Sequence, residues 1–256
     1  MTKTLESLRG KICIAVVLLL FALYFNRQFL INATFGKTID PNSGKKTFMI
    51  LLKNKKVNEA LEVARRCTSS YPDDRDLNLF FANWYVRLGK IDLAATLAQH
   101  FLDASPEDIE FSLLLGLAYN GQNRNREARY LFQNIINIDP AHLKAILYLG
   151  TIESTEGNDA EALSLFSEAV KNHPNSSQAH NYISTQLLKD NEYEKAEKHL
   201  RKAIKLSKSN SVAMVNLAIA LAKQNKKAKS KNWVERALQI APYDQRAITM
   251  LKKLNE

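Results

Sequence analysis

The side chains that could carry out chemistry are few and irregularly spaced in this chain of 256 residues. The five histidines are His100, His142, His173, His180 and His199, and none has a partner at the spacing of a metal site. The chain contains no CxxC, HExxH, glycine-rich phosphate loop or GxSxG elbow, and its carboxylates are scattered. The sequence therefore predicts no catalytic, cofactor-binding or metal-binding residue, and it predicts that the protein is not an enzyme.

The two cysteines, Cys13 and Cys67, imply no disulfide framework. Cys13 lies in an apolar N-terminal run and lacks the small preceding residues of a lipoprotein signal. Cys67 falls on a column of small residues that also holds Ala169, Ala203 and Ala237, spaced by multiples of 34. We expect Cys67 to be a packed core thiol rather than a reactive one.

Several residue types recur every 34 residues, which indicates one repeated supersecondary unit. Five of the six prolines lie on one such column, and two further columns hold mainly small residues. The columns are Pro72, Pro106, Pro140, Pro174 and Pro242; Ala60, Ala94, Ala128, Ala162, Ala196 and Ser230; and Phe48, Ala82, Gly116, Gly150, Ser184 and Ala218.

One copy of the repeat predicts a pair of helices. Residues 141–154 carry apolar side chains at helical spacing, with Pro140 fitting the first helical turn and Asp139 placed to cap it. A turn at Gly157 precedes a second helix that places Ala162, Leu163, Phe166, Ala169 and Val170 on one face. Small residues at Gly150 and Ala162 would let the two helices approach closely. The unit is thus a helix hairpin that stacks on copies of itself.

The pattern of Leu149-Gly150, Gly157, Ala162, Phe166, Ala169 and Pro174 resembles the tetratricopeptide repeat. The preceding copy reads Leu115-Gly116, Tyr119, Ala128, Phe132 and Pro140, and the resemblance covers roughly residues 41–256. Two copies depart from the pattern, because Ala98 replaces a large residue and Gly44 replaces an aromatic one. Gly44 leaves open whether the first unit has a complete first helix.

This resemblance implies an all-α protein, an α-solenoid of stacked hairpins with a C-terminal capping helix. The apolar run near the N-terminus adds the expectation of one N-terminal transmembrane helix before the solenoid. The expected parts are a basic tail at 1–11, an anchor at 12–31, a linker at 32–43, about six repeats at 44–243 and a capping helix at 244–256.

The anchor rests on the apolar run from Ile12 to Phe25, extended to Ile31 with Arg27 reaching the interface. A cleaved signal peptide is the alternative, but only Ala33 offers a small residue before a cut. Basic residues flank the run on both sides, so the positive-inside count is nearly balanced. We expect a single-pass protein of the bacterial inner membrane with its repeat domain in the periplasm.

Residues that the family places along a concave groove, on the first helix of each hairpin, are the expected partner-binding site. They are Leu79, Phe80, Asn83, Leu113, Leu114, Leu117, Leu147, Tyr148, Thr151, Asn181, Tyr182 and Thr185, followed by Val215, Asn216 and Ile219. The basic residues with which one subclass of the family grips acidic chaperone tails are missing here. The groove is apolar and then neutral, so an amphipathic helix or an extended segment is the expected ligand, unless helix packing buries these leucines.

Positive charge gathers towards the C-terminus, where residues 189–232 hold 12 Lys and Arg against 4 Asp and Glu; residues 57–188 hold 10 against 17. The expected basic patch is Lys223, Lys226, Lys227, Lys229 and Lys231. It is either a solvated turn or a dock for an acidic partner or anionic lipid, and nucleic acid is disfavoured because no aromatic residues interleave the lysines.

These features predict a membrane-anchored adaptor that binds partner proteins, in the manner of bacterial envelope factors for pilus, secretion or cytochrome assembly. Two alternatives remain: a chaperone-like factor that receives exported or inserted chains, and an accessory subunit of a membrane enzyme. No small-molecule substrate is expected.

Overall fold

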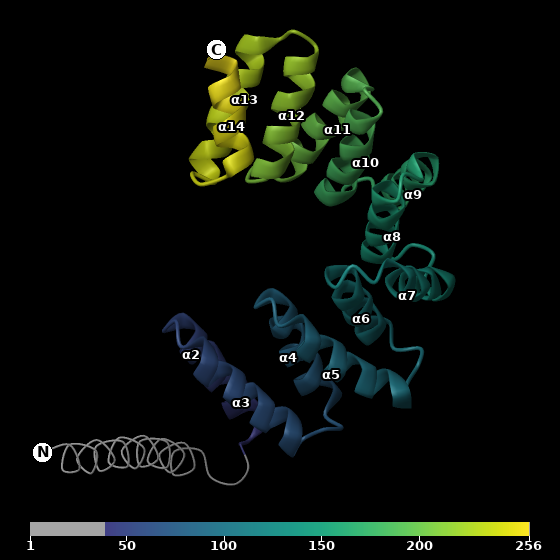
Figure 1. Ribbon diagram of the computed structural model, residues 1–256, viewed down its shortest axis with the longest axis vertical. Helices are drawn as coiled ribbons and strands as arrows, with labels where there is room; N and C mark the ends of the chain where they lie inside the picture. The colour runs from purple at the N-terminus through teal and green to yellow at the C-terminus, as the bar shows by residue number, and fades with distance from the viewer. Residues whose placement is uncertain (1–38, 256) are drawn as a thin grey trace, which may run out of the picture. The chain divides into compact units, whose positions relative to one another are not determined.

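The computed structural model describes residues 39–255, and within that range every regular element is an α-helix (Figure 1). First helices of the hairpins have 13 residues and second helices 14, as the period of 34 requires. The first helices are α2 (Pro41–Lys53), α4 (Arg75–Arg87), α6 (Ile109–Gly121), α8 (Leu143–Thr155), α10 (Ser177–Lys189) and α12 (Ser211–Lys223). The second helices are α3 (Val57–Ser70), α5 (Ile91–Ala104), α7 (Asn125–Ile138), α9 (Asp159–Asn172), α11 (Tyr193–Leu206) and α13 (Lys227–Ile240). The final helix, α14 (Gln245–Asn255), has 11 residues.

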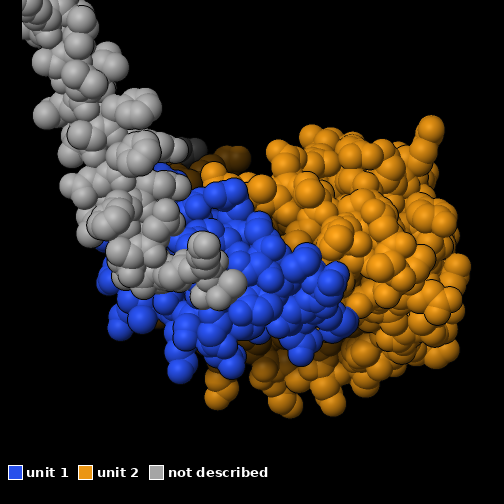
Figure 2. Space-filling model, turned by 90° about the horizontal axis from the view of Figure 1, so that it is seen from below, with its two compact units in different colours: residues 1–81 blue, residues 82–256 orange. Residues whose placement is uncertain are grey.

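The chain divides into two compact units, Met1–Phe81 and Ala82–Glu256, coloured separately in Figure 2. The described part of the first unit contains α2, α3 and the beginning of α4. The second unit contains helices α5 to α14, in which each hairpin packs its two helices together and consecutive hairpins pack second helix on first helix. The expected α-solenoid is confirmed in this form. None of the helices in residues 39–255 is long and apolar enough to cross a membrane. The expected anchor at 12–31 lies outside the described residues.

Each first helix, and α14, begins after a capping side chain, and these caps form a further column with a period of 34. In six of the seven the cap is Asp, Ser or Asn, and in α8 it is His142, whose Nδ1 accepts from the backbone N–H of Ala145 at 3.2 Å. The caps are Asp40, Asp74, Asp108, His142, Ser176, Asn210 and Asp244. The prediction that Asp139 caps this helix was wrong. Asp139 instead accepts from Ala141 N–H inside the turn that contains Pro140, so the helix begins three residues after the proline.

The turn within each hairpin passes through one residue in the left-handed conformation, again at a period of 34. These residues are Lys55, Gly89, Asn123, Gly157, Asn191 and Asn225, with φ between 59° and 86°. Glycine and asparagine tolerate this conformation best. Lys55 is the one residue of this column that is neither glycine nor asparagine, so its left-handed backbone carries strain that the other five copies avoid.

Small residues on the first helix face large ones on the second helix of the same hairpin. A Cβ atom placed on Gly150 would lie 2.7 Å from Phe166 Cε1, and one on Gly116 would lie 2.6 Å from Phe132 Cε1. The glycine at position 150 is therefore needed for close packing, but the close contact is with the Phe166 ring and not with the backbone of the second helix. This contact joins a helix backbone and an aromatic ring edge, and both phenylalanines are buried.

The first hairpin has a complete first helix. The space between its two helices is filled by other side chains than in the later hairpins. Gly44 is buried, and a Cβ atom there would collide with Cys67 Sγ. Cys67 is a free, buried thiol, as expected, and burial raises its pKa. Phe48 fills the position of Gly150 and packs edge-on against Phe81 with ring centroids 5.2 Å apart. Gly44 thus makes room for a cysteine where three later copies have alanine.

Candidate partner-binding surface

The first helices of the second unit present a surface that is partly apolar and partly neutral. Leu113, Leu117, Tyr148, Tyr182 and Ile219 are half-buried and pack their inner sides against the core. Thr151 and Asn181 are also half-buried, and Thr185 is exposed. None of these side chains carries a charge at neutral pH. The accessible residues are thus uncharged throughout, and the polar members Thr151, Asn181 and Thr185 are interspersed with Tyr182 and Ile219 along the chain.

Four residues expected on this surface are buried instead, and one of them is Asn216, which is 7% exposed. Leu114 is 4% exposed, Leu147 is 3% exposed and Val215 is fully buried. Helix packing covers them, so they cannot contact a ligand. Of the expected leucines in the second unit, only Leu113 and Leu117 remain accessible.

Two tyrosines mark the junctions between hairpins. The ring of Tyr148 stacks on Phe132 of the preceding hairpin, with centroids 5.7 Å apart and planes 22° apart. Tyr182 repeats the contact one hairpin later, 5.7 Å from Phe166. Burial, and then the neighbouring Tyr148, raise the pKa of Tyr182. Each tyrosine is fixed on one side by a core phenylalanine and keeps part of its ring accessible, which is the environment of an anchoring aromatic at a protein interface.

The polar part of the surface is held by side-chain amides. Asn216 Nδ2 donates to Asn181 Oδ1 at 3.3 Å and lies 3.5 Å from Thr185 Oγ1. Asn216 itself is buried, so it positions Asn181 and Thr185 rather than meeting a ligand directly. These two side chains retain hydrogen-bonding capacity for the backbone of a bound segment.

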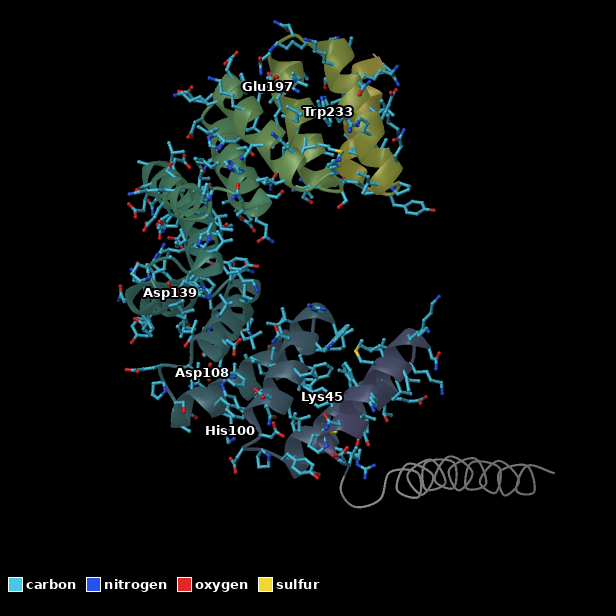
Figure 3. All side chains as sticks on the ribbon, turned by 180° about the vertical axis from the view of Figure 1, so that it is seen from behind. Lys45, His100, Asp108, Asp139, Glu197 and Trp233 are labelled. Carbon is cyan, nitrogen blue, oxygen red and sulfur yellow. The ribbon has the colours of Figure 1, made fainter. Side chains whose placement is uncertain are left out.

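Phe80, which was expected on the partner-binding surface, lies in the first unit. Phe80 is half-buried and packs edge-on against Phe48 and Phe81, with centroids 6.0 and 5.2 Å away. The ammonium of Lys45 (Figure 3) lies 5.5 Å from the Phe80 ring centroid. Leu79 is half-buried, and Asn83, in the second unit, is exposed.

All five lysines of the expected basic patch are exposed. Lys226 bonds Glu197 Oε2 at 3.2 Å and Gln224 Oε1 at 2.6 Å. The other four have no ion pair in the described part of the chain. Lys226 is therefore part of the hairpin junction, and Lys223, Lys227, Lys229 and Lys231 remain available to an anionic ligand.

The best-placed carboxylates join consecutive hairpins rather than forming a catalytic pair. Arg129 on α7 pairs with Glu153 on α8 at 2.7 Å, and Lys189 on α10 pairs with Asp159 on α9 at 2.5 Å. Glu197 on α11 (labelled in Figure 3) accepts from residues of the following hairpin. Burial would raise the pKa of Glu197, but hydrogen bonds from Arg201, Gln224 and Lys226 outweigh burial and lower it. These ionised carboxylates therefore hold consecutive hairpins together through ion pairs.

One pair of histidines lies close together without metal-binding partners. His180 Nδ1 and His199 Nδ1 are 2.9 Å apart, and His180 Nε2 is 3.1 Å from the Pro174 carbonyl. Burial and the charge of His180 lower the pKa of His199. Across residues 39–255, no group of three or more His, Cys, Asp or Glu side chains could hold a metal ion. The two histidines form a part-buried hydrogen bond that joins α10 to α11.

Two family models match the chain, and both are described as the tetratricopeptide repeat. One matches residues 81–142 and 147–211, and the other matches residues 187–254. No curated protein matches the chain.

Solved structures are similar in fold at low sequence identity. TTC0263, a thermophilic TPR protein of Thermus thermophilus, has 20% identity and a TM-score of 0.60, over 70% of this chain and 97% of its own. PilF of Pseudomonas aeruginosa has 15% identity and a TM-score of 0.63, over 70% and 82%. YrrB, a TPR protein with an unusual peptide-binding site, has 16% identity and a TM-score of 0.52, over 72% and 97%. These likenesses show the fold alone.

Proposed function

This chain belongs to the tetratricopeptide repeat family, and we propose that it is a non-enzymatic adaptor whose first-helix surface binds a partner protein. Repeats of this family generally serve as protein-interaction scaffolds, and no catalytic family matches the chain. The ligand that fits best is an uncharged or amphipathic segment, helical or extended, whose apolar side chains face the leucines and tyrosines of this surface.

The accessible, uncharged surface of α6, α8 and α10 carries this proposal. Its apolar members are Leu113, Leu117, Tyr148 and Tyr182, and its polar members are Thr151, Asn181 and Thr185. Half-buried aromatic and aliphatic side chains that already pack against the core are held in place before binding. A ligand can therefore bury their apolar surface at a low cost in side-chain entropy. YrrB, which has the same fold, has a peptide-binding site, and this supports a proposal that a protein of this fold binds a peptide segment.

Affinity purification of the full chain in mild detergent, with mass spectrometry, tests this surface. The test variant is Leu117→Asp with Tyr182→Ser, and the matched control is Tyr130→Ser, because Tyr130 is exposed on a second helix. We expect the double variant to lose the partner that the wild type and the control both recover, with an unchanged helical signal. A partner retained by the double variant would contradict the proposed surface.

We further propose that residues 12–31 anchor the protein in the bacterial inner membrane and leave the repeats in the periplasm, where the adaptor assists assembly of an envelope complex. The support is the uninterrupted apolar run in the sequence, without a convincing cleavage site. The mature N-terminus by mass spectrometry and extraction with carbonate test the anchor. A mature chain beginning near Thr34 in the soluble fraction would contradict it.

A further inference from the structure

One face of α2 is unusual because it combines exposed apolar side chains with lysines. Lys46, Met49, Ile50 and Lys53 lie at positions i, i+3, i+4 and i+7, so they share one side of the helix, here called the outer face of α2. Met49 is 42% exposed and Ile50 is 60% exposed. The opposite side of α2 carries Gly44 and Phe48, which are buried. No acidic residue occurs within α2.

The position of Ile50 in the repeat is buried in four of the five later first helices, and its counterpart in α4, Trp84, is half-buried. Its counterparts in α6, α8, α10 and α12 are Ala118, Ile152, Gln186 and Ala220, and all are at most 1% exposed. Gln186 shows what covers this position, because it bonds Ser154 and Asp159 of the hairpin before it. In residues 39–255 no hairpin precedes α2. An apolar side chain at Ile50 therefore stands where a preceding element would normally pack.

The rest of this face is not built to receive another hairpin. Ser43 and Lys46 are exposed where the next copy has the buried Leu77 and the half-buried Phe80. Terminal repeats of solenoids usually have a polar outer side. Here the side is polar and cationic but retains Met49 and Ile50 between two lysines, so it offers apolar side chains for insertion and positive charge for anionic headgroups on one face.

We propose that the outer face of α2 lies on an anionic lipid bilayer, with Met49 and Ile50 inserted among the headgroups and Lys46 and Lys53 paired with lipid phosphates. The inference rests on the proposed anchor. Nine residues separate Ile31 from Pro41, and they span at most about 30 Å when extended. An anchor that ends at Ile31 therefore keeps α2 within reach of the bilayer surface.

Charge favours a lipid surface over a protein ligand. Lys55 and Lys56 continue the positive charge into the turn after α2, and among the described residues only Lys56 of these two has an acidic partner, Glu59 at 3.3 Å. Each lysine near an anionic surface strengthens binding roughly fivefold, and that attraction decays within about 10 Å at 0.1 M salt. Contact with the bilayer would fix the orientation of the first hairpin relative to the membrane.

The test uses the full chain in liposomes of phosphatidylcholine with or without phosphatidylglycerol. Cys13→Ser removes one thiol, and Cys67 is buried. An environment-sensitive dye is then attached at Ile50→Cys or, as the control, at Tyr130→Cys on α7, where the side chain is 67% exposed. Lipids with a nitroxide near the headgroup report contact with the bilayer.

We expect severalfold stronger quenching at position 50 than at position 130 in vesicles that contain phosphatidylglycerol. Lys46→Glu with Lys53→Glu should remove most of the difference. Lys144→Glu with Lys171→Glu, an equal change of charge on other exposed lysines, should leave it unchanged.

Equal quenching at both positions, in protein that floats with the vesicles, would overturn this inference and leave the anchor standing. A dye at position 50 that is shielded from water but not quenched by the lipid would also overturn it, in favour of a protein occupant. Protein that fails to float would overturn both the anchor and the inference.

Discussion

Replacing Gly150 by serine should destabilise the solenoid, because the side chain would enter the space of the Phe166 ring. The added Cβ would lie 2.7 Å from Cε1 and 3.0 Å from Cζ, about 1 Å closer than two carbons normally pack. Overpacking of this kind costs about 1–3 kcal/mol. Removing a mid-helix glycine returns at most about 0.5–1 kcal/mol. The net loss should therefore be about 0.5–2 kcal/mol, and Gly150→Leu should fall at the upper end of the overpacking range or beyond it.

The chain itself supplies the compensating change. One hairpin later the same two positions hold Ser184 and Leu200, and both are fully buried. Phe166→Leu alone should cost about 1–3 kcal/mol through the cavity that it leaves. The double variant Gly150→Ser with Phe166→Leu should be more stable than the two single losses predict, by roughly 1 kcal/mol of coupling.

Thermal unfolding of the full chain in mild detergent, followed by circular dichroism, measures these differences. A change of 1 kcal/mol shifts Tm by about 2–4 °C in a domain of this size. We expect each single variant to lower Tm and the double variant to recover part of the loss. Strictly additive losses, or an unchanged Tm for Gly150→Ser, would refute the proposed contact between backbone and ring.

Three further changes test other parts of the structure. Lys55→Gly should raise the stability of the first hairpin by about 1 kcal/mol because it relieves a left-handed backbone at φ 59°, and a lower Tm would contradict this. The pKa of His199 is lowered from 6.5 in the folded state, so the unfolded state takes up a proton more readily. The contribution of His199 to stability is therefore present above pH 6.5 and is lost as the pH falls below that value. His199→Gln should flatten the change of Tm between about pH 7 and 5. Replacing Lys227, Lys229 and Lys231 by glutamate should weaken the binding of an anionic ligand, mainly at low salt. A titration of binding against salt concentration measures this. A loss of affinity that does not depend on salt would indicate a packed contact instead.

The stacked helices could be predicted from the sequence because the period of 34 is carried by residues that pack. The sequence contains a second signal, because residue sizes in the first-helix column of Phe48 and Gly150 are matched to residue sizes in the second-helix column of Ala64 and Phe166. Phe48 is the large member of a column of mainly small residues, and it faces Ala64 in the repeat pattern, whereas Gly150 faces Phe166. In these two hairpins a large residue in one column accompanies a small residue in the other. The pairing does not explain Ala98, because its counterpart on the first helix, Ala82, is also small.

The start of the first helices could not be located from proline, because proline at the first helical turn is only one of its usual positions. Asp139 and Pro140 belong to the connecting turn, and the cap is His142, which is the least typical of its column. The column as a whole, with Asp, Ser or Asn at the other six positions, is the signal in the sequence that locates these helix starts.

The accessible members of the candidate surface could not be separated from the core by position on the first helix alone. Leu113 and Leu114 are neighbours in sequence, yet only Leu113 keeps accessible area beyond a few per cent. The helical period places both residues on α6 but does not specify how far neighbouring helices cover each of them.

Photocrosslinking from single positions in the full chain tests the proposed adaptor surface most directly. A benzophenone side chain at Leu117 or at Tyr182 would report contacts of the first helices, and one at Tyr130 would report a second helix. We predict adducts with the same partner from positions 117 and 182 and none from position 130. Adducts with that partner from position 130, and none from the first helices, would contradict the proposed surface.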